Sequence, residues 1–268
     1  MADKTKGADV NRRDLIAKGA AGVGGAVVIA AGAAEEAAAQ GAPSRWDRTA
    51  DVVVIGSGAA GLPAAIRARD LGASVIVVEE NTDVGGHAIV SNAITNLGGG
   101  NALQKKYGIE DSADEVYLEY TRPDHPMTRY NDREVVRAFA DHNVEVFDFL
   151  VAKGVMFRDV KPVNSLAEGS RIARRIPMQI LSDNYNETIN NTGGSGLIRP
   201  LEKAARAGGV DILLEHRMTR IVREKPTEGR VIGIVATDLK SNRPVTIRAR
   251  KAVRLSHRRN RKRPPQGP

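Results

Sequence analysis

Gly56-Ser57-Gly58-Ala59-Ala60-Gly61 decides the fold of this chain, because it places glycine at the first, third and sixth positions of one short turn. The preceding residues 50–55 are mostly apolar and β-branched, as in a buried parallel strand. Residues 62–71 are rich in alanine and form a helix that Gly72 ends, and residues 74–78 repeat the apolar strand pattern. Strand, turn, helix and strand within about 30 residues predict a βαβ unit of an α/β fold.

Each glycine of the turn has a physical role in binding a dinucleotide. Gly56 permits the tight turn, Gly58 lets the backbone approach a pyrophosphate, and Gly61 allows the helix to lie close to the strand. The helix N-terminus offers free N–H groups to the phosphates. Glu79 ends the second strand and can accept hydrogen bonds from a ribose. A strand–turn–helix without a ligand is the simpler alternative, but the full pattern favours dinucleotide binding.

The middle of the chain is predicted to be helical. Ser112 and Glu115 form a possible capping box for one helix, and Asn131 and Glu134 form another for a longer helix that Gly154 ends. Beyond it, residues 160–191 are polar and are expected to be irregular.

The last third of the chain returns to strands. Residues 192–196 lead into a helix over 197–207, and residues 210–214 predict a strand. Three further apolar runs predict a small antiparallel meander, namely residues 218–222, 231–236 and 245–249.

Composition excludes several kinds of site. The 268 residues include no cysteine, so a disulfide scaffold, a thiolate zinc site, a thiol nucleophile and an iron–sulfur cluster are ruled out. The net charge is +8, but residues 254–268 hold six basic residues and no acid, which leaves +2 for the rest. This nearly neutral body argues against nucleic-acid binding. The tail is expected to be disordered, and it is either a polyanion-binding arm or, as we prefer, the out-of-frame end of an interrupted gene.

The first 39 residues predict an export signal. Arg12-Arg13 precedes the uncharged residues 19–34, and Ala37-Ala38-Ala39 suits a signal peptidase. The pattern resembles a twin-arginine signal, which implies export to the periplasm by the twin-arginine machinery. A membrane span is the alternative, but residues 19–34 fall short of the roughly 20 apolar residues that a bilayer requires. No stable membrane anchor is therefore expected.

Several segments beyond the glycine turn resemble one family. Glu79 to Gly86 joins an acidic strand end to a second glycine pair, as in proteins that bind FAD. Further similar segments are Gly85-Gly86-His87, Leu97 to Gly100, Tyr130-Asn131-Asp132, Gly194 to Leu201, Arg217 to Ile221 and Ile247 to Val253. From Asp51 to Val253 the chain resembles the FAD-dependent fumarate reductase/succinate dehydrogenase flavoproteins, which include ketosteroid dehydrogenases and enoate reductases.

The resemblance implies an FAD oxidoreductase that moves a hydride between flavin N5 and an activated C–C bond of a carboxylate or ketone. A small-molecule substrate and a periplasmic electron donor are its expected partners. The resemblance assigns no catalytic residue. No metal site is expected, because His125, His142 and His216 show no metal-ligand spacing with one another or with nearby acids. The cofactor-binding residues expected from the glycine turn and the resemblance together are Gly56, Gly58, Ala59, Ala60, Gly61, Glu79, Glu80, Gly85, Gly86, His87, Ala88 and Met218.

The roles of His87 and of two residues outside this set leave alternatives open. His87 either gives a hydrogen bond beside the cofactor or, as in some relatives, attaches FAD covalently. Thr192 and Ser195 lie where the family's cap approaches substrate, but the glycines beside them can equally serve to begin the helix.

The chain departs from the family pattern at two places. Ser91-Asn92-Ala93 replaces a small residue followed by two glycines near the flavin ring, where added Cβ atoms would crowd the cofactor. After Val253 the family continues with an apolar strand, the rest of a substrate cap and a proton-donating arginine, which this chain lacks. We therefore expect a C-terminally truncated protein with weak or no FAD binding and no turnover, or an inactive dinucleotide-binding fragment.

The predicted organisation is a Rossmann-like FAD domain with a partial helical cap insertion, an antiparallel β-meander and disordered termini. The expected parts are the signal (1–39), the first part of the FAD domain (50–110), the partial cap (111–191), the continuation of the FAD domain with the meander (192–253) and the basic tail (254–268).

Overall fold

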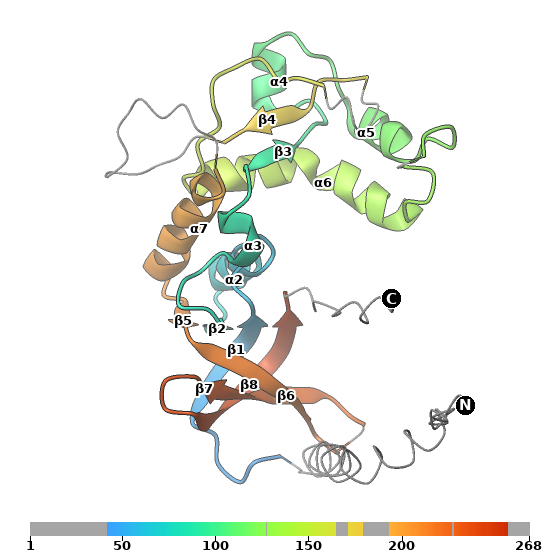
Figure 1. The fold of residues 1–268 in the computed structure, drawn as a ribbon. Coiled ribbons are helices and arrows are strands. Elements are labelled where there is room, and N and C mark those ends of the chain that lie inside the picture. Colours follow the sequence, from blue (N-terminus) through green and yellow to red (C-terminus); the bar gives the residue numbers. More distant parts are fainter. Residues whose placement is uncertain (1–41, 127, 165–170, 179–192, 227, 257–268) are drawn as a thin grey trace, which may run out of the picture.

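The structure is a computed structural model that describes residues 42–126, 128–164, 171–178, 193–226 and 228–256 (Figure 1). The predicted export signal and residues 257–268 of the predicted tail lie outside the described residues. Among the described helices, none combines the length and the apolar character that crossing a membrane requires.

The predicted βαβ unit is present at the start of the fold. It consists of β1 (Arg48–Ile55), α2 (Gly61–Asp70) and β2 (Val75–Val78). The two strands are parallel, in a register that runs from the pair Val52 and Val75 to the pair Ile55 and Val78. The expected α/β class and its parallel strand pair are therefore confirmed.

One six-stranded sheet contains both the parallel strands and the meander, in the order β5-β2-β1-β8-β7-β6. The remaining strands are β5 (Asp211–Leu213), β6 (His216–Arg223), β7 (Val231–Asp238) and β8 (Arg243–Leu255). Strands β6, β7 and β8 pair antiparallel, as predicted, while β8 also pairs parallel with β1. The meander is thus continuous with the main sheet, and β8 joins the two parts.

The start of the expected basic tail is wrong. Arg254 and Leu255 belong to β8 and pair with Val54 and Ile55 of β1, and the Ser256 amide donates to the Ile55 carbonyl at 2.9 Å. Backbone groups form this ladder regardless of the side chains, so an arginine whose side chain is exposed does not end the strand. The strand reaches the glycine turn after β1.

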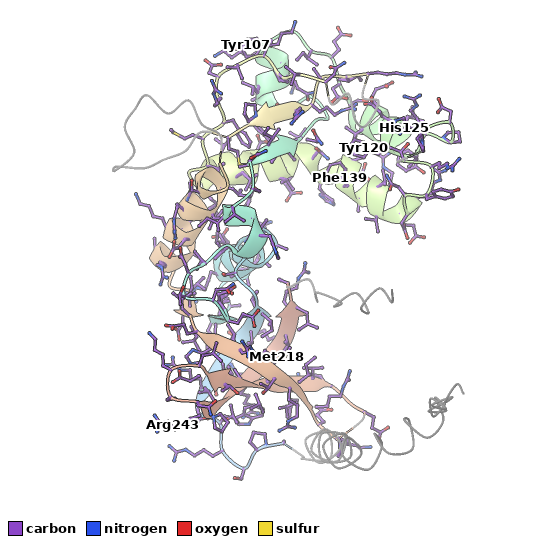
Figure 2. All side chains as sticks on the ribbon, in the orientation of Figure 1. Tyr107, Tyr120, His125, Phe139, Met218 and Arg243 are labelled. Carbon is purple, nitrogen blue, oxygen red and sulfur yellow. The ribbon has the colours of Figure 1, made fainter. Side chains whose placement is uncertain are left out.

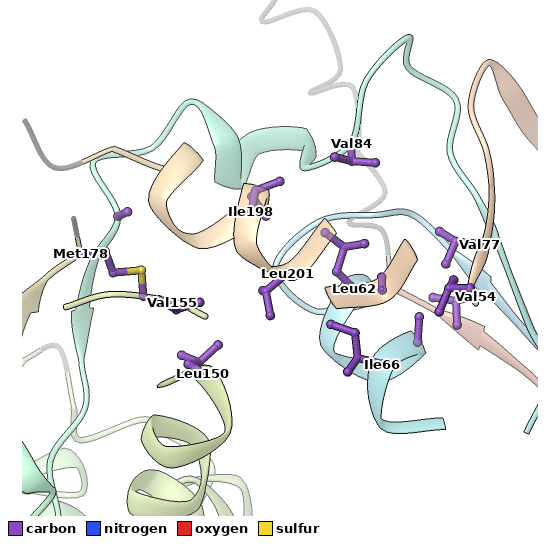
Figure 3. Close-up of a cluster of buried hydrophobic side chains, with 14 of the residues drawn as sticks. Val54, Leu62, Ile66, Val77, Val84, Leu150, Val155, Met178, Ile198 and Leu201 are labelled. Carbon is purple, nitrogen blue, oxygen red and sulfur yellow. The ribbon is translucent and has the colours of Figure 1, made fainter. Parts of the chain in front are cut away.

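The parallel strands β1 and β2 are buried on both faces over most of their length, which explains their continuous apolar runs. Val53 and Val54 point to opposite faces, and both are 0% exposed. On one face, α2 and α7 (Ser195–Ala207) cover Val54 with Leu62, Ile66, Ile198 and Leu201 (Figure 3). On the other face, Val53 lies in a second cluster with residues of β7 and β8, including Ile234 and Ile247.

A helical region lies at the end of the molecule opposite the meander (Figure 1). It contains α4 (Ala102–Lys106), α5 (Ala113–Tyr120) and α6 (Arg133–Ala152), with β3 (Ile94–Asn96) paired to β4 (Arg175–Pro177). Strand β4 lies in the stretch that was expected to be irregular, so that expectation is wrong for residues 175–177. A strand of three residues is too short to show an alternating or continuous apolar pattern in the sequence.

One of the two predicted helix caps is confirmed. The Ser112 hydroxyl accepts from the Glu115 amide at 3.1 Å at the start of α5. The second is wrong, because Asp132 rather than Asn131 caps α6 and accepts from the amides of Glu134 and Val135. Asn131 instead donates its side-chain amide to the Tyr120 carbonyl at 3.0 Å, which ties the two helices together.

A buried polar network holds the glycine-rich loop after β3. The amides of Gly98, Gly99 and Gly100 donate to the side chains of Asn143, Asp111 and Gln104, respectively. Arg174 donates two hydrogen bonds to Asp111, at 2.7 and 2.6 Å, and also contacts Glu119. Every loop amide is thus paired away from water, as buried backbone requires.

Candidate cofactor site

A cleft of about 880 Å³ opens at the carboxyl ends of β1 and β2. Three segments line it: the glycine turn after β1, the loop and short helix α3 (Gly86–Ile89) after β2, and the start of β6. Ligands of open α/β sheets bind at this edge. Ten of the twelve predicted residues line the cleft, namely Gly56, Gly58, Ala59, Glu79, Glu80, Gly85, Gly86, His87, Ala88 and Met218.

Ala60 and Gly61 do not line the cleft, although both belong to the glycine turn. A Cβ added to Gly61 would lie 1.9 Å from the Gly56 carbonyl oxygen, so Gly61 sets the close contact between helix and strand. Ala60 is the exposed N-cap of α2. In the described part of the chain, the amides of Ala59 and Ala60 donate to no protein acceptor, and they remain available to a phosphate.

The other two glycines of the turn shape the cleft. Gly56 has φ +91°, a conformation that favours glycine. A Cβ added to Gly58 would lie 3.6 Å from the Gly85 carbonyl oxygen, so Gly58 faces the second glycine loop across a narrow gap. The turn therefore has the geometry expected of a backbone cradle.

The Glu79 carboxylate is 5% exposed and accepts four hydrogen bonds. Its Oε2 accepts from the amide and the hydroxyl of Ser57 at 2.8 and 2.6 Å. Its Oε1 accepts from the amide and the side chain of Asn81 at 3.0 and 2.8 Å. A ribose hydroxyl that bound here would share Glu79 with these donors or replace the Asn81 side chain.

Helix α7 supports the second glycine loop from behind. A Cβ added to Gly85, which has φ +107°, would lie 2.9 Å from Ile198. A Cβ added to Gly194 would lie 1.8 Å from the Ala88 carbonyl oxygen. Glycine at 194 thus allows α7 to contact α3 closely. This glycine therefore has a packing role in addition to preceding the first residue of the helix. Ser195 is the first residue of α7, and Thr192 lies outside the described residues.

An ion pair fixes the same loop from its outer side. Arg199 of α7 donates to Asp83 at 2.9 and 2.5 Å and to Glu202 at 2.8 Å. The hydrogen bonds from Arg199 lower the pKa of Asp83, while burial raises it by less. Asp83 therefore stays charged and keeps the loop joined to α7.

Charged residues meet at the rim of the cleft, where the meander approaches. Glu80 and Arg217 form an exposed ion pair with 3.1 Å between Oε2 and Nε. Met218 follows in β6 (Figure 2), and the register of β6 shifts directly after it. His216 donates from Nδ1 to the Leu214 carbonyl at 2.7 Å. His87 is exposed on α3, a position that leaves both interpretations of its role open.

Sequence reasoning missed several residues of the cleft. Asn81 and Asp83 lie in the segment from Glu79 to Gly86, but nothing in that segment indicated a role for them. Ser57, which is buried and does not itself line the cleft, is the variable position of the glycine pattern. Ser256 follows β8, lines the cleft and has a buried hydroxyl oxygen with no hydrogen-bond partner among the described residues. Together with the unpaired amides of the turn, this hydroxyl fits an anionic dinucleotide that would occupy the cleft.

A βαβ unit with this cradle, a second glycine loop and a meander at its rim defines an FAD-binding α/β domain. The chain belongs to the FAD binding domain family, which it matches over residues 51–265. The predicted family and its FAD cofactor are confirmed. The match continues past Val253 to residue 265, which contradicts the expectation that the family resemblance ends at Val253 and removes the basis for an out-of-frame tail.

Curated relatives come from the predicted group of enzymes. The chain is 32% identical over 193 residues to an NADH:fumarate oxidoreductase of Klebsiella pneumoniae, and this match covers 71% of the chain and 18% of that protein. It is 27% identical over 232 residues to a 3-oxo-5-alpha-steroid 4-dehydrogenase of Comamonas testosteroni, and this match covers 79% of the chain and 42% of that protein.

A solved structure supports the same assignment. The 3-ketosteroid-Δ4-(5α)-dehydrogenase of Rhodococcus jostii, determined with 4-androstene-3,17-dione, has 30% identity and a TM-score of 0.65, over 79% of this chain and 46% of that one. The chain thus spans less than half the length of these relatives. It belongs to a family of FAD-dependent oxidoreductases that act on carbon–carbon bonds.

Proposed function

We propose that this protein is part of an FAD-dependent oxidoreductase that transfers a hydride between flavin N5 and an activated C–C bond of a carboxylate or ketone. The observation that carries the proposal is the cleft between two glycine loops, since a second glycine loop extends the site beyond the pyrophosphate. The relatives add support, because their names include a fumarate oxidoreductase and steroid dehydrogenases. The flavin supplies the redox chemistry, and the protein supplies binding and orientation.

Within this proposal, the residues of the chain hold the adenosine–pyrophosphate half of FAD. The free amides at the start of α2 receive the pyrophosphate, where the helix dipole favours negative charge. Glu79 accepts from the ribose, and its own charge disfavours a 2′-phosphate. Met218 approaches the adenine from the meander. Gly85, Gly86 and the residues of α3 would line the part of FAD that lies beyond the pyrophosphate.

The isolated chain, in our proposal, binds FAD weakly and does not turn over. This proposal is supported by the coverage of the relatives, since the chain spans less than half of their length. An inactive dinucleotide-binding fragment is the alternative, and it differs from the oxidoreductase in lacking any redox function.

Purification of the protein without and with added FAD tests these statements. The flavin absorbance spectrum reports binding, and fumarate and 4-androstene-3,17-dione serve as substrates with reduced viologen as electron donor. We expect sub-stoichiometric flavin and no substrate-dependent oxidation of the donor. Stoichiometric flavin with turnover would overturn the proposed incompleteness, whereas failure to bind FAD at millimolar concentration would overturn the cofactor site.

The proposed setting is the periplasm, reached through the twin-arginine machinery and shared with an electron donor. The paired arginines in the sequence support this proposal. A fusion of residues 1–45 to a periplasmic reporter tests it, with Arg12→Lys and Arg13→Lys changed together. We expect the double substitution to abolish export, and unchanged export would contradict the proposed pathway.

A further inference from the structure

Ser57 lies between the two glycine loops and contacts both. It is 0% exposed, although its neighbours Gly56 and Gly58 line the cleft. Its hydroxyl donates to Glu79 Oε2 at 2.6 Å and accepts from the Gly85 amide at 3.1 Å. One side chain therefore connects the turn after β1, the end of β2 and the second glycine loop.

The direction of each hydrogen bond is fixed by chemistry. An ionised carboxylate only accepts hydrogen bonds, so the Ser57 hydroxyl donates its single proton in the hydrogen bond to Glu79. A backbone amide only donates, so the Gly85 amide uses a lone pair of the same oxygen. The charge of Glu79 strengthens the first bond and, through the polarised hydroxyl, the second.

The second glycine loop has little freedom to move around this contact. Ile198 closes one side of Gly85, since an added Cβ would lie 2.9 Å from it. Gly58 faces the Gly85 carbonyl oxygen, which would lie 3.6 Å from an added Cβ. The Ser57 hydroxyl thus determines how far the loop stands from the turn.

We propose that Ser57 is a positioning residue that sets the spacing between the two glycine loops and thereby the affinity for the FAD pyrophosphate. The inference rests on the proposed cofactor site. Ser57 does not line the cleft, so it acts through Glu79 and Gly85. Nothing in the G-x-G-x-x-G pattern assigns a role to this position, because only its glycines have defined tasks.

Ser57→Ala in the full chain tests the proposal, with Ser74→Ala as a matched control. The Ser74 hydroxyl also links two backbone segments, accepting from the Asp51 amide at 2.8 Å and donating to the Asp51 carboxylate at 3.1 Å. It precedes β2, at the end of the strands away from the cleft. Affinity is measured by flavin fluorescence, at a temperature where circular dichroism shows all variants to be folded.

We expect Ser57→Ala to weaken FAD binding about tenfold, the effect of losing one hydrogen bond to a charged group. Ser74→Ala should leave the dissociation constant within about twofold. Without FAD, amide hydrogen exchange at Gly85 should be faster in Ser57→Ala than in the wild type and unchanged in Ser74→Ala. Unchanged Gly85 exchange would reject the contact itself.

A double-mutant cycle separates positioning from general stability. If Ser57 acts through Glu79, Ser57→Ala should weaken FAD binding less in a Glu79→Gln background than alone. Equal effects in both backgrounds would reject this route. If the wild type binds FAD and Ser57→Ala binds it with the same affinity, the role of Ser57 is rejected and the cofactor site is kept. If the wild type does not bind FAD, the cofactor site and the role of Ser57 are both rejected.

Discussion

Arg199 on α7 holds Asp83 through two parallel hydrogen bonds, Nη1 to Oδ1 at 2.9 Å and Nη2 to Oδ2 at 2.5 Å. Asp83 lines the cleft and lies in the second glycine loop, two residues before Gly85. The pair therefore connects a helix beneath the site to the loop that forms its wall. Such a planar, two-point contact fixes orientation as well as distance.

Arg199→Gln should weaken FAD binding by about three- to tenfold, because the loop loses its outer support. The free energy of unfolding should fall by less than about 1 kcal/mol, since the side chains are 42% and 50% exposed and solvent screens the pair. The control is Arg206→Gln on the same helix, which removes the 3.0 Å bond from Arg206 Nε to Glu202 and leaves both hydrogen bonds from Arg199 to Asp83 in place. Equal affinities of the two variants would contradict the role of Arg199.

Substitution by alanine should have different effects at Gly58, where it should lower FAD affinity, and at Gly61, where it should lower stability. At Gly58 the added methyl group meets only the Gly85 oxygen at 3.6 Å, an ordinary contact, but it projects between the two glycine loops. Gly58→Ala should therefore lower FAD affinity at least about tenfold with little change in melting temperature. Flavin titration and thermal denaturation of the apoprotein measure the two effects.

At Gly61 the same methyl group would lie 1.9 Å from the Gly56 oxygen, so the helix must move from the strand. Gly61→Ala should lower the stability of the apoprotein by about 2 kcal/mol or more. A Gly58→Ala protein that melts as early as Gly61→Ala would show that Gly58 serves packing rather than the cleft.

The features predicted correctly depend on residues that lie close together in the chain. The βαβ unit, its glycine turn and the three strands of the meander each carry a complete local pattern of strand, turn or helix. Ser112 could be recognised as a cap because its hydroxyl oxygen accepts from the amide of Glu115, only three residues further along the chain.

The features that were missed depend on distant partners. Asp83 and Arg199 are 116 positions apart, and no pattern in either segment indicates the other. The extension of β8 to Leu255 follows from backbone pairing with β1, which outweighs the unfavourable arginine at 254. The cap of α6 shows a different limit, since Asn131 and Asp132 are both good capping residues and tertiary contacts decide between them.

Trp46 is the chain's single tryptophan and reports on the meander. A Cβ added to Gly233 of β7 would lie 2.5 Å from its ring and 2.4 Å from the Ile247 carbonyl oxygen. Gly233→Ala should thus separate the ring from the sheet, shift its emission to longer wavelength and lower stability by about 2 kcal/mol. Tryptophan emission during urea denaturation measures both effects, and an unshifted native spectrum would mean that the ring does not rest on Gly233.

Asp111 predicts how stability depends on pH. Burial of its side chain raises the pKa, but Arg174, Gln104 and the Gly99 amide donate hydrogen bonds that outweigh burial, so the pKa is lowered. Its stabilising contribution is therefore complete above the unfolded pKa of about 3.9 and is lost as the pH falls through the lower folded value. Asp111→Asn should cost about 3 kcal/mol at neutral pH, because Arg174 loses a buried partner.

The cost of Asp111→Asn should shrink as the pH falls below about 4, because acid protonates the Asp111 carboxyl of the unfolded wild type first and that of the folded wild type only at the lower folded pKa. Urea denaturation at several pH values, followed by circular dichroism, measures the difference between wild type and variant. Asp114→Asn is the matched control, because Asp114 pairs with Arg137 at the surface, where its side chain is 85% exposed. That variant should lose less than about 1 kcal/mol. A difference between wild type and Asp111→Asn that stays constant down to about pH 3 would show that Asp111 does not titrate with the lowered pKa, and that the network stabilises the loop through shape rather than charge.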